Sequence, residues 1–127
     1  MLSSALSYDG ICCMRATIDI HGTQLDINVM LDTGFTSFTG FGLKLPTAYS
    51  RYAHYTGTGH VRVADNREVT ADSIPDAKII KIEDHQLAQA INLPTIFLDG
   101  PEAIGVFFLQ KCIFNLNGPS KIALLQF

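Results

Sequence analysis

Short apolar segments separated by turn residues are the feature that most constrains the fold of this chain. The stretches "MRATIDI" and "LDINVML" alternate between apolar and polar residues or run apolar, and the intervening "HGTQ" contains Gly22, which suits a hairpin turn. "HVRVAD" and "EVTADSI" flank Asn66 and Arg67 in the same manner. Further strand-like stretches are "AKIIKI", "INLPTIFL", "IFNLN" and "KIALLQF", the last two separated by Gly118 and Pro119. This pattern predicts a mainly β domain.

Helical patterns are weak by comparison. "GVFFLQKC" predicts a short helix of about two turns that starts at Gly105 and ends before Ile113. "EDHQLAQAI" fits either a turn or two of helix or a loop, and its spacing does not separate these alternatives. We therefore expect an all-β fold with one short C-terminal helix, arranged as a small barrel or a sandwich.

Length and composition limit the classes of function. At 127 residues the chain suits a single domain with a substantial core. Its residues are 47% hydrophobic and 17% charged, with a formal net charge of −3. These values exclude a disordered acidic tail and provide no basic surface for nucleic acid. Peptides, small molecules or a second copy of the chain are the expected partners.

The cysteines and histidines do not suggest a metal or cofactor site. The three cysteines are Cys12, Cys13 and Cys112, and an odd number with an adjacent pair is a poor disulfide framework, which favours a reducing compartment. Adjacent cysteines lack the spacing of zinc ligands, and the four histidines are scattered at positions 21, 54, 60 and 85. We expect neither metal nor cofactor.

The N-terminal stretch does not resemble a targeting signal. "MLSSALSYDG" has no basic region and no long apolar core. The longest apolar stretch, "AIGVFFL", is far shorter than the roughly 20 residues that a membrane span needs. The expectation is a soluble cytoplasmic protein with no membrane partner.

One carboxylate stands out as a candidate for catalysis. In "VMLDTGFTSF", Asp32 follows an apolar run and begins a tight turn that is rich in hydroxyl groups. A firmly held carboxylate can act as a general base toward water, and two carboxylates in contact share one proton. Gly34 allows a sharp turn in which its N–H can face the carboxylate, while Thr33 and Thr36 offer hydroxyls that could hold the turn rigid. The alternative is an ordinary turn residue, since Asp-x-Gly is common turn chemistry.

"LDTGFT" resembles the active-site signature of aspartic proteases: an apolar residue, Asp, Thr, Gly, any residue, then Ser or Thr. The single triplet and short chain are similar to the retropepsin-like (retroviral-type) enzymes, which assemble as homodimers. "YTGTGHVRVAD" resembles the family's flap, the hairpin that closes over bound peptide. "AIGVFFLQKCIFNLN" resembles a second hallmark, an apolar-apolar-Gly turn followed by a short helix and a strand.

The resemblance implies roles for three groups of residues. Asp32 is the catalytic residue, supported by Thr33, Gly34 and Thr36. The flap would cover substrate with Thr56, Gly57, Thr58, Gly59 and His60, for which an ordinary flexible loop is the alternative. The turn that packs beside the active-site loop would be Ile104 and Gly105, although Gly105 could simply cap a helix. There are departures from the family pattern, since Val106 and Phe107 follow Gly105, Phe35 is bulky, and the glycine-rich segment is polar.

The resemblance extends over residues 14–127, leaving residues 1–13 as an N-terminal extension that could be disordered. It implies a closed small β-barrel of the acid-protease type that forms a homodimer, with "KIALLQF" adding to the interface. The implied function is an aspartic endopeptidase that hydrolyses a peptide or protein substrate with water activated by two Asp32 carboxylates. The alternative is a peptide-binding or scaffolding module of the same fold with little or no proteolysis.

Overall fold

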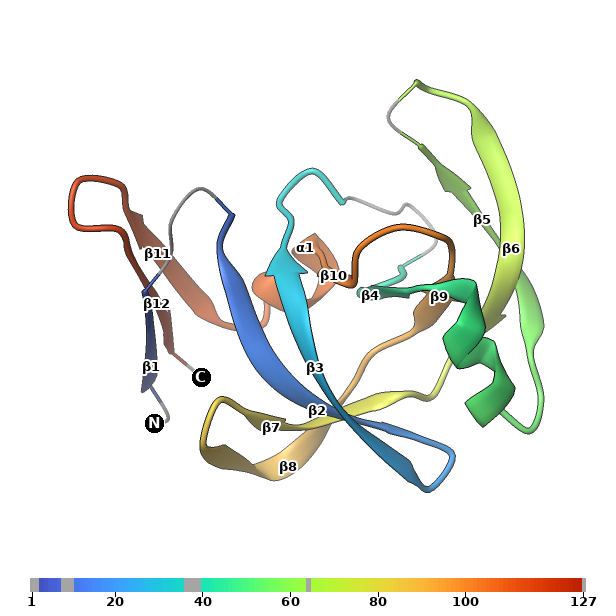
Figure 1. The fold of residues 1–127 in the computed structure, drawn as a ribbon, viewed down its shortest axis with the longest axis horizontal. Helices are drawn as coiled ribbons and strands as arrows, with labels where there is room; N and C mark the ends of the chain where they lie inside the picture. The colour runs from blue at the N-terminus through green and yellow to red at the C-terminus, as the bar shows by residue number, and fades with distance from the viewer. Residues whose placement is uncertain (1–2, 8–10, 36–39, 64, 127) are drawn as a thin grey trace.

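The structure is a computed structural model that describes residues 3–7, 11–35, 40–63 and 65–126. The described residues form a larger and a smaller β-sheet with two short helices (Figure 1). The larger sheet contains β2 (Cys13–Ile20), β3 (Thr23–Leu31), β4 (Leu43–Leu45), β5 (Gly57–Arg62), β6 (Glu68–Ile74), β7 (Lys78–Ile82), β8 (His85–Asn92), β9 (Thr95–Phe97) and β10 (Ala103–Ile104). The smaller sheet contains β1 (Ser3–Ser7), β11 (Ile113–Asn117) and β12 (Ile122–Gln126), and the helices are η1 (Thr47–Tyr52) and α1 (Val106–Leu109). The prediction of a mainly β fold with one short α-helix near the C-terminus is confirmed. This helix has four residues, about one turn instead of the expected two, and η1, a 3₁₀-helix, was not predicted.

The larger sheet is open rather than closed. Its strand order is β5-β6-β9-β4-β10-β3-β2-β7-β8, so that β5 and β8 are its edges within the described part of the chain. The sheet stays open because the β5–β6 hairpin joins β9 only through the pairs Ser73↔Ile96 and Ile74↔Thr95 and then projects away from the body. The closed barrel that the resemblance implied is therefore not what the strand pairing forms.

The β2–β3 hairpin forms as its alternating pattern predicted. Its pairing runs from Ile20↔Thr23 to Cys13↔Met30. The two turn residues, His21 and Gly22, have φ values of 49° and 94°, and positive φ at both positions is the mark of a type I′ turn. The inward-facing residues of β2 are buried: Met14, Ala16, Ile18 and Ile20.

The β5–β6 hairpin turns around Asn66 and Arg67, as predicted. Its end is closed by hydrogen bonds from Val63 N–H to Arg67 O (2.9 Å) and from Asn66 N–H to Val63 O (2.8 Å). The glycine-rich segment, which the resemblance assigned to the cover over the substrate, is therefore not the tip of the hairpin. Gly57 and the residues after it begin β5, at the end of the hairpin that joins the body (Figure 1).

The segment "EDHQLAQAI" contributes strand β8 rather than a helix or a loop. Residues at its two ends pair with β7, as Ile82↔His85 and Ile79↔Ile91, with an irregularity between them. Leu87 and Ile91 both pack against the core, because residues four apart in a strand lie on the same face. Their spacing of four residues is also a helical spacing, which is why the sequence alone did not distinguish the two structures.

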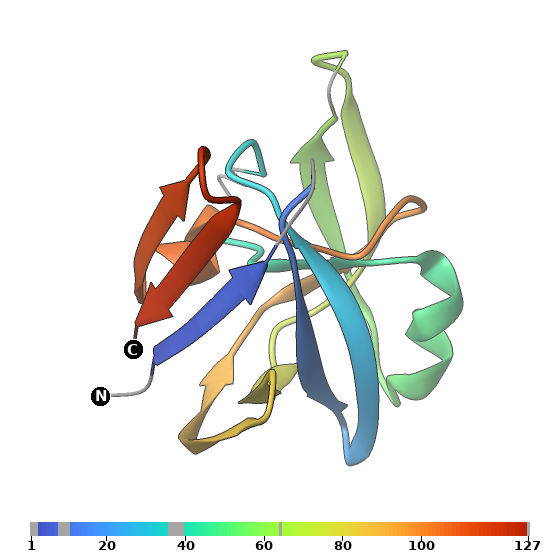
Figure 2. The same cartoon turned by 60° about the vertical axis from the view of Figure 1, so that its left-hand side comes forward.

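The smaller sheet joins the two ends of the chain. Strand β12 lies at its centre, between β1 and β11, and β1 pairs with β12 from Ser3↔Gln126 to Ser7↔Ile122. Figures 1 and 2 show the N- and C-terminal ends close together beside this sheet. The expected extension at residues 1–13 thus contains a strand and the first residue of β2, while the domain boundary after residue 13 stays a prediction. In the part of the chain that the structure describes, no helix has the length and apolar character to cross a membrane.

Candidate active site

Asp32 stands at the point where β3 ends. Strand β10 lies parallel to β3, with Ala103 opposite Met30 and Ile104 opposite Leu31. The Asp32 N–H donates a hydrogen bond of 2.9 Å to the carbonyl oxygen of Ile104, which continues this pairing by one step. The backbone of Asp32 is therefore held by a strand that comes from the opposite end of the sequence.

The turn after Asp32 directs a backbone N–H at its side chain. Gly34 N–H donates to Asp32 Oδ1 at 2.9 Å, and Phe35 N–H donates to Asp32 O at 3.1 Å. A β-carbon at residue 34 would lie 3.2 Å from Oδ1, tighter than most side-chain contacts, so glycine suits this position. Asp32 is half-buried, whereas Thr33 and Gly34 are exposed. Thr36, the fourth residue predicted for this loop, lies outside the described residues.

Gly105 lies directly against the Asp32 loop. A β-carbon at residue 105 would stand 2.5 Å from Phe35 O and 2.7 Å from Phe35 Cδ1, so a larger residue has no room. Val106 N–H donates to Phe35 O at 3.1 Å, and Gly105 N–H donates to Gly42 O at 3.0 Å. Gly105 is also the N-cap residue of α1, so the two roles considered for it from the sequence coincide.

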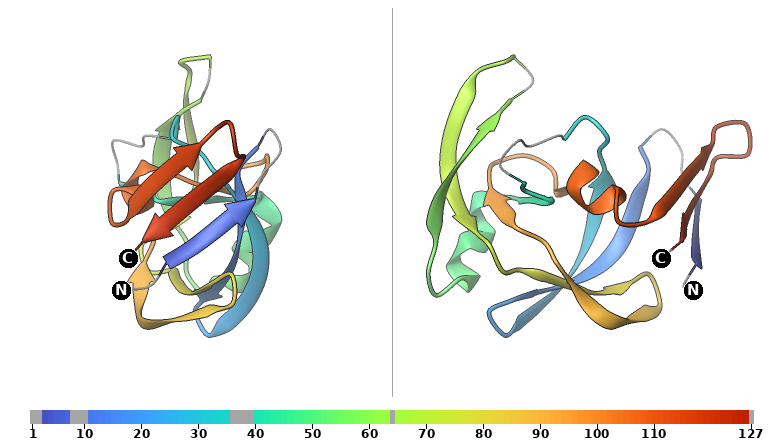
Figure 3. Two further views of the ribbon diagram at one scale, coloured as in Figure 1. Left: turned by 90° about the vertical axis from the view of Figure 1, so that its left-hand side faces the viewer. Right: turned by 180° about the vertical axis from the view of Figure 1, so that it is seen from behind.

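A separate apolar cluster connects the Asp32 loop with the β5–β6 hairpin. Phe41, Val61 and Ile96 form its buried centre. Phe35 from the Asp32 loop packs against this centre, as do Val69, Ala71 and Leu98. The face of the hairpin that points toward the active-site loop is therefore apolar. In Figures 1 and 3 the hairpin and the end of β3 project on the same side of the molecule.

Gly59 is held inside this cluster. A β-carbon there would stand 2.4 Å from Phe41 Cζ and 3.1 Å from Ile96 Cδ1. Gly42 is enclosed in a similar manner by Leu93 and Phe107, each of which would approach a β-carbon to 2.9 Å. No role was predicted from the sequence for Phe41, Gly42 or Ile96. The local signal for Phe41 and Gly42 was the density of Phe and Gly that follows the Asp-Thr-Gly triplet, and Ile96 lies in the predicted strand "INLPTIFL".

The remaining residues predicted for the flap lie apart from Asp32. Thr58 and His60 are exposed on the outer face of β5, and Thr56 precedes the strand. His60 Nδ1 lies 3.0 Å from Thr70 Oγ1 and 3.6 Å from Glu68 Oε1 across the hairpin. Alternation along the strand thus separates this polar outer face from the apolar inner face of Gly59 and Val61.

The described residues give little support to catalysis by a metal ion or by a cysteine thiol. No group of three or more histidine, cysteine or acidic side chains there could hold a metal ion. Burial raises the pKa of the Cys112 thiol, and burial together with Cys13 raises the pKa of the Cys12 thiol. Both thiols are therefore less often in the reactive thiolate form at neutral pH. Burial and the neighbouring Glu102 likewise raise the pKa of Tyr49.

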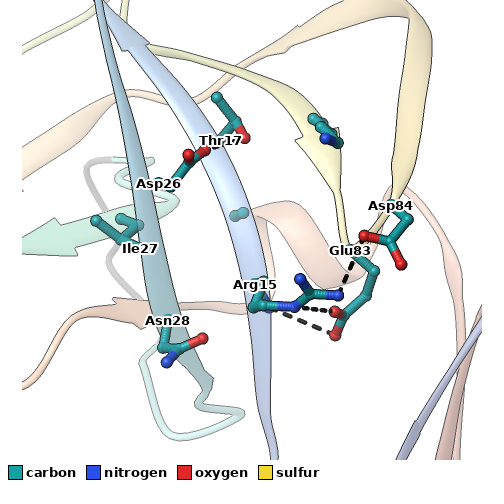
Figure 4. Close-up of a pocket in the computed structure, with 9 residues that line it drawn as sticks. Arg15, Thr17, Asp26, Ile27, Asn28, Glu83 and Asp84 are labelled. Atoms are coloured by element: carbon teal, nitrogen blue, oxygen red, sulfur yellow. Dashed lines mark hydrogen bonds and ion pairs between the residues drawn. The ribbon is translucent and has the colours of Figure 1, made fainter.

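A polar depression of about 290 Å³ lies elsewhere, over β2, β3 and the β7–β8 turn (Figure 4). Several of its polar groups bind one another, since Arg15 Nε lies 2.9 Å from Glu83 Oε2 and Thr17 Oγ1 donates to Asp26 Oδ1 at 2.6 Å. Asp32 does not line it. This depression therefore has no part in the arrangement around Asp32.

Comparison with solved structures agrees with the fold. No protein-family model and no curated protein matches the sequence. The structure is similar to a retropepsin-like aspartic protease from Rickettsia conorii, with a TM-score of 0.62 and 12% sequence identity. The similarity covers 99% of this chain and 91% of the Rickettsia chain. The protein thus has a retropepsin-like fold, the fold that the Asp-Thr-Gly triplet and its spacing had suggested.

Proposed function

We propose that this protein is an aspartic endopeptidase that acts as a homodimer and takes Asp32 from each copy for catalysis. One observation carries the proposal: within a retropepsin-like fold, the Asp32 carboxylate follows β3 directly and accepts a 2.9 Å hydrogen bond from Gly34 N–H. Among the described residues, no second carboxylate hydrogen-bonds to Asp32, and no cation forms an ion pair with it. A second copy of the chain would supply the missing carboxylate.

The chemistry follows from two carboxylates that share one proton. The ionised member accepts a proton from a water molecule, while the protonated member donates one to the oxygen of the peptide carbonyl. The water oxygen attacks the carbonyl carbon, and the tetrahedral species then collapses as the C–N bond breaks and the amine takes up a proton. The pKa values of such a site belong to the pair of carboxylates rather than to either alone. No metal and no cofactor takes part in this proposed reaction.

The surface around Asp32 is suited to a two-fold axis. Thr33 and Gly34 are exposed beside the half-buried Asp32, so a second loop of the same kind can approach them. The smaller sheet also exposes large apolar side chains, among them Ile113 (54% exposed) and Ile122 (44% exposed). Burying such residues against a second copy would remove apolar surface from water and stabilise the dimer.

In this proposal the β5–β6 hairpin covers the peptide substrate. Its inner face is apolar and already contacts the Asp32 loop through Phe35. The proposal therefore assigns the contact with substrate to the inner face of the hairpin, around Val61 and Val69. Thr56, Thr58 and His60, which were expected to cover the substrate, lie before β5 or on the outer face of the hairpin.

The test is peptide cleavage by wild-type protein and Asp32→Asn, purified identically and assayed from about pH 3 to 8, which spans the carboxyl range. Activity that is bell-shaped in pH, inhibited by pepstatin-type compounds and absent from Asp32→Asn is the expected result. Equal activity in both proteins would mean that another nucleophile or a contaminant is responsible. Absence of cleavage by a folded wild-type dimer would reject the peptidase.

A peptide-binding module with little proteolysis is the second candidate, and the charged tip of the hairpin favours it. Asp65 and Arg67 at this tip form an exposed ion pair of 3.5 Å, which is poorly suited to closing over an apolar peptide. Equal affinity of wild type and Asp32→Asn for captured peptides, with no cleavage by either protein, would support this candidate.

A further inference from the structure

The β2–β3 turn contains a histidine whose ring contacts other segments of the chain. His21 occupies the first turn position with a φ of 49°. Asn, Asp and Gly are the residues preferred there, and histidine also tolerates positive φ better than most side chains. The backbone therefore accepts a histidine, and the contacts of its ring set it apart from a residue that only forms the turn.

The His21 ring makes two hydrogen bonds to segments distant in sequence. Its Nε2 lies 2.8 Å from Asp76 Oδ1, and its Nδ1 accepts a hydrogen bond of 3.1 Å from His54 N–H. Because Nδ1 accepts, the ring proton of the neutral side chain is on Nε2 and is donated to Asp76. The His21 and His54 rings also stack, with centroids 5.9 Å apart and planes inclined by 6°. The His21 side chain is only 18% exposed.

These two partners flank the β5–β6 hairpin. His54 precedes β5, which begins at Gly57, and Asp76 follows β6, which ends at Ile74. One imidazole therefore joins the segments by which the hairpin leaves and re-enters the body. It fastens both of them to the β2–β3 hairpin, whose second strand leads to Asp32.

Among the described residues, the hairpin is also held to the body by the apolar cluster in which Val61 packs with Phe41 and Ile96, and by a small number of hydrogen bonds. The exit segment is also held by Asn92 Nδ2, which donates to Pro75 O at 2.9 Å. The hairpin itself pairs with the sheet through two residues of β6, Ser73 and Ile74. On the entry side, the hydrogen bond from His54 N–H to His21 links the residues before β5 to the body of the sheet.

We propose that His21 is a positioning residue that fixes the base of the β5–β6 hairpin and thereby sets how the hairpin lies over Asp32. The covering role of the hairpin rests on the proposed peptidase function, but the attachment of its base by His21 does not. Substitutions that break the contacts of His21 increase opening of the hairpin and weaken substrate binding, with little effect on the chemistry at Asp32.

The experiment compares His21→Asn and Asp76→Ala with two controls. Asparagine favours the type I′ turn but is too short to reach Asp76, so a loss of folding is not expected. Asp76→Asn keeps an oxygen that can accept from His21 Nε2. Asp84→Ala removes another exposed carboxylate, 83% exposed against 55% for Asp76, that contacts Arg15 instead. Amide hydrogen exchange is measured over residues 57–63 and 65–74, together with kcat and KM on a cleaved peptide.

The exchange rate of the hairpin amides is expected to rise by about three- to tenfold in His21→Asn and Asp76→Ala. This is the increase expected when the loss of one or two hydrogen bonds makes local opening of the hairpin easier. KM should rise by a similar factor while kcat changes by less than about twofold, and both controls should resemble wild type. Unchanged exchange in His21→Asn and Asp76→Ala would overturn the proposal, as would an equal increase in Asp84→Ala. If the wild type cleaves no peptide, the peptidase proposal fails, and hydrogen exchange alone still decides the role of His21.

Discussion

Gly105 packs against Phe35 so closely that a β-carbon at residue 105 would stand 2.5 Å from the Phe35 carbonyl oxygen. This contact joins the turn before α1 to the loop that carries Asp32, and it is reinforced by the hydrogen bond from Val106 N–H to Phe35 O. The requirement for glycine is one of space and not of backbone conformation, since the φ of Gly105 is −110°.

Replacing Gly105 with alanine is therefore expected to displace the Asp32 loop. An added methyl group in a closely packed site costs about 1–3 kcal/mol in the free energy of unfolding. We expect Gly105→Ala to lose that stability in urea unfolding and to lose peptide cleavage. Gly118→Ala is the control, because a β-carbon at Gly118 meets nothing within 4 Å. Equal stability of the two variants would contradict the packing role of Gly105.

Two glycines of β5 offer a matched test of the apolar cluster. Gly59→Ala places a methyl group 2.4 Å from Phe41 Cζ, whereas Gly57→Ala meets Ser73 O at an ordinary 3.7 Å. We expect Gly59→Ala to destabilise the protein by about 1–3 kcal/mol and Gly57→Ala to have a much smaller effect. Chemical denaturation measures both. A Gly59→Ala protein as stable as Gly57→Ala would mean that the cluster adapts to the methyl group.

The smaller sheet is expected to contribute to the proposed dimer. Ile113→Asp places a charge on an exposed apolar face, where dimerisation would have to bury it without a partner. We expect the dimer to dissociate at least about tenfold more readily, as measured by sedimentation equilibrium, and peptidase activity to fall with it. Tyr55→Asp, at a position 77% exposed and outside this sheet, is the control. Loss of dimer in both variants, or in neither, would argue against this interface.

The half-buried Cys112 thiol predicts a decline of stability in alkaline solution. Burial raises its pKa above the ordinary value of 9.0, so above that pH the folded chain holds a proton that the unfolded chain has lost. Its contribution to stability is therefore complete below about pH 9 and is lost as the pH rises through the pKa of the folded protein. Urea unfolding at several pH values should show this decline, and Cys112→Ala should show a smaller one. An identical pH dependence in the two proteins would exclude Cys112 as a cause.

Much of the local structure follows directly from the sequence. The alternation of "MRATIDI" and "LDINVML" around Gly22 predicted the β2–β3 hairpin, and "HVRVAD" and "EVTADSI" predicted the β5–β6 hairpin. These predictions succeeded because a strand with one buried face needs an apolar residue at every second position, a condition that neighbouring residues alone record. The prominence of Asp32 within "VMLDTGFTSF" is likewise a property of its immediate neighbours in the sequence.

Tertiary contacts decided what those patterns could not. Gly59 was expected in a flap over the substrate or in an ordinary flexible loop, and it is instead enclosed in a strand by Phe41 and Ile96. His21 was one of four scattered histidines until the fold brought His54 and Asp76 to its ring. Both outcomes depend on contacts between segments that lie far apart in the chain. The sequence by itself determined the two hairpins and the position of Asp32 at the end of a strand. Packing between distant segments determined strands β1 and β8, the open sheet, the placement of the β5–β6 hairpin and the surroundings of Asp32.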